Sequence, residues 1–194
     1  MSTQPLLSIH TLDASWSDFA REIEAFIARL GLSHLQLSCD HAALRVNDSD
    51  TAARLADEFT RRGRVISNNI INGRPILIIK LDEPLQLGEQ SVYCVELPYP
   101  GDKLYPQQGW EHVELVLPVA ATDCEQLASA LSEQVPHIAA VLSGDTEIKV
   151  KLSSPRGEHE RLPNPTIAFK LGGLCVKIHA HSIEAVIASE QGCQ

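Results

Sequence analysis

The stretch Asp-His-Ala-Ala-Leu at residues 40–44 returns later in the chain as Glu-His-Val-Glu-Leu at residues 111–115. Each copy places an acidic residue, a histidine, two further residues and a leucine in the same order. Each copy also lies in a segment that reads as a β-strand, and a helix-like segment follows it. A repeated unit with a histidine at the same strand position predicts a site built between two copies of one fold module.

The composition is that of an ordinary globular protein. The chain has 194 residues, of which 44% are hydrophobic and 21% are charged, so it can bury a core as one domain or as two small halves. A formal net charge of −9 argues against nucleic acid as a partner, because phosphate contacts need clustered Lys and Arg. The apolar runs are far too short to span a membrane, so no membrane partner is expected.

The cysteines and the N-terminus bear on localisation. The five cysteines are odd in number and have no Cys-X-X-Cys pairing, which favours reduced thiols over a disulfide framework. Residues 1–12 contain neither a positively charged segment nor a cleavage site. We therefore expect a cytoplasmic protein, and the sequence carries no indication of an oligomeric state.

An additional helix is predicted before the repeat. Residues 15–30 have the periodicity of an amphipathic helix, with Ser15 or Ser17 as its cap and Gly31 as its end. This helix belongs to neither repeat. We therefore expect residues 1–38 to form a helical extension packed on the outside.

The first repeat predicts a β-α-β-β-β module over residues 39–109. The expected elements are a strand, a helix and three further strands, over residues 41–46, 50–62, 65–71, 76–81 and 91–97. Asn72-Gly73, between the second and third strands, is typical of a two-residue hairpin turn.

The second repeat predicts the same order of elements over residues 110–194. Its helices are expected over residues 123–134 and 182–189, the second of them being a short C-terminal helix. The fold class that follows is α+β, with two β-α-β-β-β modules forming curved sheets around a shared cavity.

The strand register of the second half has two possible alignments. Residues 75–81 resemble residues 165–171, which requires an insertion before the matched strand, much of it in the polar stretch 153–164. The other alignment keeps the original spacing and pairs Lys80 with Lys151.

Two modules that each open on a histidine-bearing strand resemble the vicinal oxygen chelate superfamily, whose members include glyoxalase I, methylmalonyl-CoA epimerase and the extradiol dioxygenases. The resemblance covers about residues 40 to 181. It implies metal ligands on the first and fourth strands of each module. Carried over to this chain, these positions fall on His41, Glu96, His112 and either Lys177 or His179.

The residue types agree with a divalent ion such as Zn, Mn, Fe or Ni. Two neutral imidazoles and a carboxylate are suitable ligands, and three protein ligands leave positions open for a substrate oxygen or water. His179 is a reasonable fourth ligand, whereas the ammonium of Lys177 has no lone pair to offer. Each ligating imidazole is expected to donate its second N–H to an orienting acceptor.

Two further residues are candidates on the same strand faces. Glu114 shares a face with His112 and can serve as a catalytic general base, although a surface carboxylate is the plain alternative. Arg45 shares a face with His41 and can bind an anionic substrate, although a solvated strand end competes with that role. Either histidine alone can equally be a hydrogen-bonded, partly buried residue.

The sequence thus predicts a divalent-metal-binding protein, and the resemblance implies an isomerase, lyase or dioxygenase that acts on a small oxygen-chelating molecule. Two alternatives remain. One is a non-catalytic small-molecule-binding protein of the same fold, and the other is a fold whose metal site has decayed. Sequence alone does not separate the three reaction types, because the metal and the groups around its ligands decide the chemistry.

Overall fold

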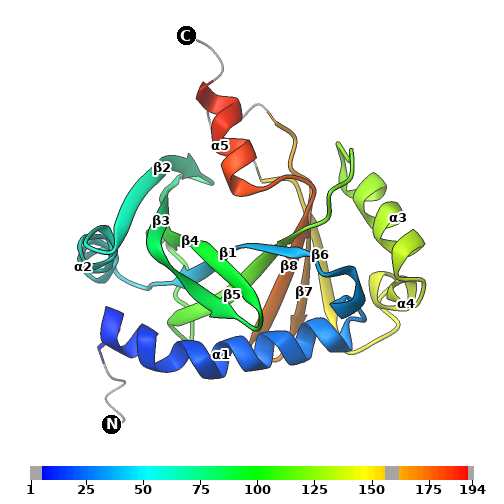
Figure 1. Ribbon diagram of the computed structural model, residues 1–194, viewed down its shortest axis with the longest axis horizontal. Coiled ribbons are helices and arrows are strands. Elements are labelled where there is room, and N and C mark those ends of the chain that lie inside the picture. Colours follow the sequence, from blue (N-terminus) through cyan, green and yellow to red (C-terminus); the bar gives the residue numbers. More distant parts are fainter. Residues whose placement is uncertain (1–5, 156–161, 192–194) are drawn as a thin grey trace.

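The computed structural model describes residues 6–155 and 162–191 (Figure 1). The N-terminal part contains the helix α1 (Ile9–Arg29) and the short 3-10 helix η1 (Ser33–Leu35). The first module consists of β1 (Ser38–Arg45), α2 (Ser49–Thr60), β2 (Gly63–Ile71), β3 (Arg74–Leu87) and β4 (Gln90–Pro98). The second consists of β5 (Gly109–Val116), α3 (Cys124–Gln134), α4 (Ile138–Leu142), β6 (Lys149–Ser153), β7 (Thr166–Leu171), β8 (Leu174–His179) and α5 (Ile183–Gln191). The predicted α+β fold with two β-α-β-β-β modules is confirmed.

A single eight-stranded sheet runs through both modules in the order β2-β3-β4-β1-β5-β8-β7-β6. The strands β1 and β5 are antiparallel neighbours at its centre, and each pairs in parallel with the last strand of its own module. In the central ladder His41 lies opposite Glu114, and Ala43 lies opposite His112. The modules therefore meet edge to edge about a pseudo-twofold axis, and both histidines fall on the same face of the sheet.

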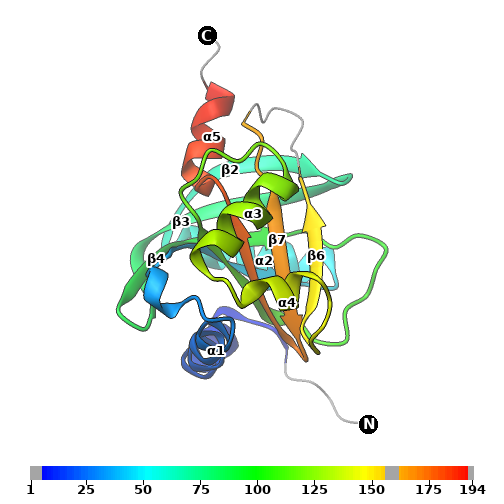
Figure 2. The same ribbon diagram turned by 90° about the vertical axis from the view of Figure 1, so that its right-hand side faces the viewer.

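The long helices cover the outer face of this curved sheet (Figures 1 and 2). Val113 on β5 packs there in the same core as Phe26 of α1 and Leu127 of α3. The opposite, concave face carries the two histidines, because side chains alternate along a strand. Helix α5 lies on that side and packs Ile187 against Ile78 of β3.

The N-terminal helix begins earlier than predicted. It starts at Ile9, where Ser8 is the cap and accepts a hydrogen bond from the backbone N–H of Thr11, whose own side chain accepts one from Ser8 in return. This reciprocal capping box outweighs the serines inside the helix as a start signal. The predicted end is confirmed, because Gly31 follows with a φ of +73°.

The first module matches its expected order, and its hairpin turn is confirmed. Asn72 and Gly73 have φ values of +52° and +77°, as a tight turn between two strands requires. The strand β3 is longer than predicted and continues to Leu87, because a register shift between Lys80 and Leu85 lets it bend and pair again with β4.

The strand pairing of the second module shows which of the two alignments is correct. Lys170 on β7 lies opposite Cys175, as Lys80 on β3 lies opposite Cys94, so the alignment with an insertion is correct. The alternative is wrong, because Lys151 belongs to the edge strand β6. The extra residues are divided between α4, which the sequence did not indicate, and the connection from β6 to β7.

Residues 156–161 of that predicted insertion lie outside the described part of the chain. Within the described part, no helix combines the length and the apolar character that crossing a membrane requires.

Candidate metal centre

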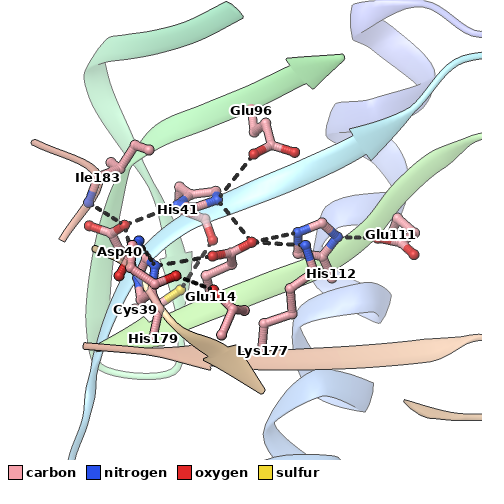
Figure 3. Close-up of polar contacts among 12 residues, drawn as sticks. Cys39, Asp40, His41, Glu96, Glu111, His112, Glu114, Lys177, His179 and Ile183 are labelled. Atoms are coloured by element: carbon pink, nitrogen blue, oxygen red, sulfur yellow. Dashed lines mark hydrogen bonds and ion pairs between the residues drawn. The ribbon is translucent and has the colours of Figure 1, made fainter. Parts of the chain in front are cut away.

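Three ligand atoms converge on the concave face at the central ladder (Figure 3). They belong to His41, His112 and Glu114, and all lie within 4.8 Å of one another. All three residues are buried. The antiparallel pairing of β1 with β5 creates this convergence, since it places His41 directly opposite Glu114.

Two β-bulges aim the acidic residue before each histidine at the imidazole. The register of the central ladder shifts between Cys39 and His41, and again between Ala43 and Leu44. Asp40 is left out of the pairing at the first shift, and Glu111 is left out at the second. A bulge redirects a side chain that strict alternation would send to the other face. Each acidic residue therefore reaches the face on which its histidine lies.

The resulting contacts fix both imidazole rings. Nδ1 of His41 donates to Asp40 over 3.0 Å, and Nδ1 of His112 donates to Glu111. These carboxylates are the orienting acceptors that the sequence predicted without identifying them. The repeated acidic-His pair was the signal for them.

The two Nε2 atoms point at Glu114. Nε2 of His112 lies 3.1 Å from Oε1 of Glu114, and Nε2 of His41 lies 3.6 Å from the same oxygen. A neutral imidazole has a single N–H, and Nδ1 holds it here, so each Nε2 presents a lone pair to a negatively charged oxygen. Among the described residues the buried Nε2 of His41 has no hydrogen-bond partner. Such a set of atoms requires a cation between them, either a proton or a metal ion.

The charges around His41 change its acidity. Burial alone would lower the pKa of His41, but the charge of Glu114, the hydrogen bond to Asp40 and the nearby carboxylates of Glu114 and Glu96 hold it well above its ordinary value. For Glu114, burial is outweighed by the charges of Lys177 and His41, which keep its pKa well below the usual range. The metal-free site therefore attracts positive charge strongly.

Glu96 and Lys177 occupy equivalent positions in the two modules. Glu96 on β4 pairs with Ala43, and Lys177 on β8 pairs with Glu114, each of these partners being two residues after its module's histidine. Oε2 of Glu96 lies 3.6 Å from Nε2 of His41. The register thus places Lys177, and not His179, at the position that corresponds to Glu96.

Lys177 forms an ion pair inside the site. Its Nζ donates to Oε1 of Glu114 over 2.9 Å. Burial opposes its charge, but the charges of Glu114 and Glu96 hold the pKa of Lys177 above its ordinary value. Lys177 is therefore an ammonium and not a ligand in this arrangement.

His179 lies beside the converging atoms. Its Nδ1 accepts a hydrogen bond from the side-chain amide of Asn164 over 3.1 Å and lies 3.2 Å from Oε2 of Glu114. Its Nε2 lies 3.3 Å from Asp40, which also contacts His41. His179 thus links the carboxylate that orients His41 to the far oxygen of Glu114.

Arg45 contacts the site through Glu111. Its Nη2 lies 3.4 Å from Oε2 of Glu111, and its guanidinium carbon lies 4.9 Å from the centre of the Tyr105 ring. The guanidinium thereby holds the carboxylate that orients His112. A direct contact of Arg45 with a substrate remains a prediction.

The residues of the site differ in how far they are exposed to solvent. The histidines are almost inaccessible, whereas the side chains of Glu96 and Lys177 are 16% and 23% exposed. Glu96 and Lys177 therefore form the more exposed edge of the cluster. At the other end, a cavity of about 440 Å³ borders Asp40 next to the start of α5.

The thiols near the site are neutral. Burial raises the pKa of Cys39 and of Cys175 to about 12 in each case. Neither thiol is among the ligand atoms that converge, so the imidazole nitrogens and the carboxylate oxygen define the donor set. Two imidazole nitrogens, one of them the unpartnered buried Nε2 of His41, and a carboxylate oxygen fit a divalent ion.

A test of the orienting carboxylates follows. We expect Glu111→Gln to weaken Zn²⁺ binding by about 10- to 100-fold without abolishing it, because the neutral amide holds His112 less firmly than the carboxylate does. The affinity is measured by competition with a chromogenic chelator. Glu133→Gln, which changes an exposed carboxylate on α3, is the matched control and should bind as the unaltered protein does. An unchanged affinity in Glu111→Gln would contradict the orienting role.

The fold and the site together define a two-module β-α-β-β-β protein with a candidate metal centre on its central ladder. The chain belongs to the YecM protein family, whose sequence pattern matches residues 8–190. It is 45% identical over 187 residues to Protein YecM of Escherichia coli (strain K12), covering 95% of this chain and 96% of that one.

Other relatives extend the comparison. An uncharacterized protein of Haemophilus influenzae is 32% identical over 182 residues, which cover 91% of this chain and 92% of that protein. A solved structure described as "Structural Genomics, Protein EC4020" covers 98% of this chain and 100% of its own, with 35% identity and a TM-score of 0.77. A methylmalonyl-CoA epimerase from Mycobacterium tuberculosis aligns over 73% of this chain with 13% identity and a TM-score of 0.44, and we draw no argument from that likeness.

Proposed function

We propose that the protein binds one divalent metal ion through His41, His112 and Glu114, and that the ion takes up a small oxygen-chelating substrate. The orientation of the two imidazoles carries the proposal. The Nδ1–H of each imidazole donates a hydrogen bond to the carboxylate of the preceding residue, and Nε2 points toward one oxygen of Glu114. Two nitrogen donors and one oxygen donor, held by outer carboxylates, match the ligand preferences of Zn, Mn, Fe and Ni.

Glu114 and Glu96 have the opposite roles in this proposal to those that the sequence suggested. Glu114 was expected to carry protons and Glu96 to bind the metal. We assign the ligand role to Glu114, because its Oε1 is the atom that both Nε2 atoms face. Glu96 then remains beside His41 on the more accessible side of the cluster, where a carboxylate can exchange a proton with a bound molecule.

The reaction type favoured by this assignment is a proton transfer. A divalent ion supplies Lewis-acid polarisation of a substrate carbonyl or enol oxygen. Glu96 accepts the proton from the carbon next to that group and can return it to another position, which is the chemistry of an isomerase. The buried histidines keep the site partly dry, which strengthens the electrostatic effect of every charge in it.

Two measurements test the proposal in sequence. Elemental analysis of protein purified without chelator is expected to find one divalent metal per chain, or to find it after the metal is added back and the excess removed. Small 2-oxo and 2-hydroxy acids are then incubated with the loaded protein in D₂O and followed by NMR for exchange of the hydrogen next to the carbonyl or hydroxyl group. The exchange should be lost in Glu96→Gln while the metal is retained. If the protein holds no metal under any of these conditions, the proposed metal-dependent enzymatic function is contradicted.

The pH dependence has a definite sign. We expect the affinity for Zn²⁺ to keep rising with pH above about 6.5, the ordinary pKa of histidine, because a protonated imidazole cannot ligate and the pKa of His41 is raised. Isothermal titration calorimetry at pH 6, 7 and 8 measures this rise. An affinity that is level across the three pH values would contradict it.

The stability of the metal-free protein should change in the opposite direction. The contacts of protonated His41 contribute fully below about 6.5, the unfolded pKa, and are lost as the pH rises through the raised folded pKa. The free energy of unfolding in urea should therefore fall over that window, and excess Zn²⁺ should offset the fall.

A further inference from the structure

Lys177 breaks the symmetry of the site. It is the pseudo-twofold counterpart of Glu96, so one module offers a carboxylate and the other an ammonium at equivalent strand positions. A divalent ion gains nothing from an ammonium, which has no lone pair. The charge at this position therefore requires a different explanation from ligation.

The ammonium and a metal ion would use the same oxygen. Nζ of Lys177 lies 2.9 Å from Oε1 of Glu114, the oxygen that faces Nε2 of His112 and of His41. An ion bound by the two imidazoles and this carboxylate repels a second cation on the same oxygen. Ion binding thus weakens the hold of Glu114 on Lys177.

Lys177 can move away from Glu114 when an ion binds, because its side chain is partly exposed. Its side chain is 23% exposed, whereas the histidines around Glu114 are almost completely buried. Figure 3 shows its long side chain reaching from β8 to Glu114, which faces both histidines. An ammonium that is displaced from one carboxylate in a partly buried site pairs with another negatively charged oxygen.

We propose that Lys177 is the anion-recognising residue of this site, pairing with Glu114 in the metal-free protein and with a carboxylate of the substrate once an ion is bound. The inference rests on the proposed metal-binding function and adds the substrate class to it. The substrate is a small acid that chelates the ion through two neighbouring oxygens, at least one of them from a carboxylate, as in 2-oxo and 2-hydroxy acids.

Oxalate is a suitable probe, because it is a small dianion that chelates through two neighbouring oxygens. The proteins compared are the unaltered chain, Lys177→Met, Lys177→Arg and the control Lys151→Met, which removes an exposed lysine of β6. Each is loaded with Co²⁺, whose visible absorption reports the coordination shell, and is titrated with oxalate by calorimetry and by absorption. The affinity for Co²⁺ alone is measured first.

The expected result has two parts. Lys177→Met should bind Co²⁺ at least as tightly as the unaltered chain does, because the competing ammonium is gone. It should then bind oxalate about ten- to a hundredfold more weakly, the usual effect of losing one charge-assisted hydrogen bond. Lys177→Arg keeps the charge and should retain most of the oxalate affinity, and Lys151→Met should behave as the unaltered chain.

The outcomes separate the two proposals. If the unaltered chain binds no Co²⁺, the metal-binding proposal fails, and this inference fails with it. If the chain binds Co²⁺ but Lys177→Met binds oxalate as tightly as before, only the role of Lys177 is overturned. Because Co²⁺ binding by Lys177→Met itself shows a folded site, misfolding cannot imitate the expected result. Should Lys177→Met fail to bind Co²⁺, the comparison is decided by Lys177→Gln, for which the same loss of oxalate affinity is required.

Discussion

Replacing His112 with alanine is expected to abolish stoichiometric metal binding. His112 is completely buried, and its Nε2 lies 3.1 Å from Glu114, so no other side chain can take its place. The loss should go well beyond the about 10- to 100-fold that the removal of an outer carboxylate causes, because a ligand itself disappears. By the symmetry of the central ladder, His41→Ala should have the same effect.

The measurement is the metal content after equilibration with excess Zn²⁺ and gel filtration. His10→Ala is the matched control, since His10 is an exposed histidine on α1. Thermal unfolding of each variant shows whether the fold is kept. A folded His112→Ala protein that still carries one Zn²⁺ per chain would contradict the assignment of this ligand.

Replacing Glu114 with leucine is expected to destabilise the metal-free protein by about 3 kcal/mol. Removing one partner of a buried ion pair leaves the other charge uncompensated, which usually costs about 3–5 kcal/mol. The lower end applies here, because the side chain of Lys177 is 23% exposed. His41 and His112 lose the carboxylate that they face in the same substitution.

A double-mutant cycle tests this prediction. Urea unfolding gives the free energy of unfolding for Glu114→Leu, Lys177→Met and the double variant. The double variant should recover most of the loss, because it removes both charges and leaves apolar groups of similar size. Strictly additive effects would show that the two residues do not stabilise each other.

The repeated motif was sufficient to predict the fold and the two histidines. Two acidic-His strands separated by equivalent elements indicated paired modules, and the structure has His41 and His112 on one face of a shared ladder. This prediction succeeded because side-chain alternation is a local property of a strand. The start of α1 was missed, because Ser8 and Thr11 cap each other and lie outside the region of clear apolar periodicity.

The rest of the site depends on register, which local pattern does not determine. Asp40 and Glu111 reach the histidine face only because two bulges interrupt the central ladder. Lys177 and His179 are two residues apart on one strand, so alternation gives them the same face, and only the pairing of β8 with β5 shows which one corresponds to Glu96. The pairing of Lys177 with Glu114 joins strands that are far apart in sequence.

The most direct test of the central claim is a crystal structure of the Zn²⁺-loaded protein with anomalous data collected at the zinc absorption edge. The account predicts one anomalous peak at about 2.0–2.2 Å from Nε2 of His41, from Nε2 of His112 and from a carboxylate oxygen of Glu114. Nδ1 of each imidazole should still donate to Asp40 or Glu111. No peak within reach of these three side chains, or a peak held by other residues alone, would contradict it.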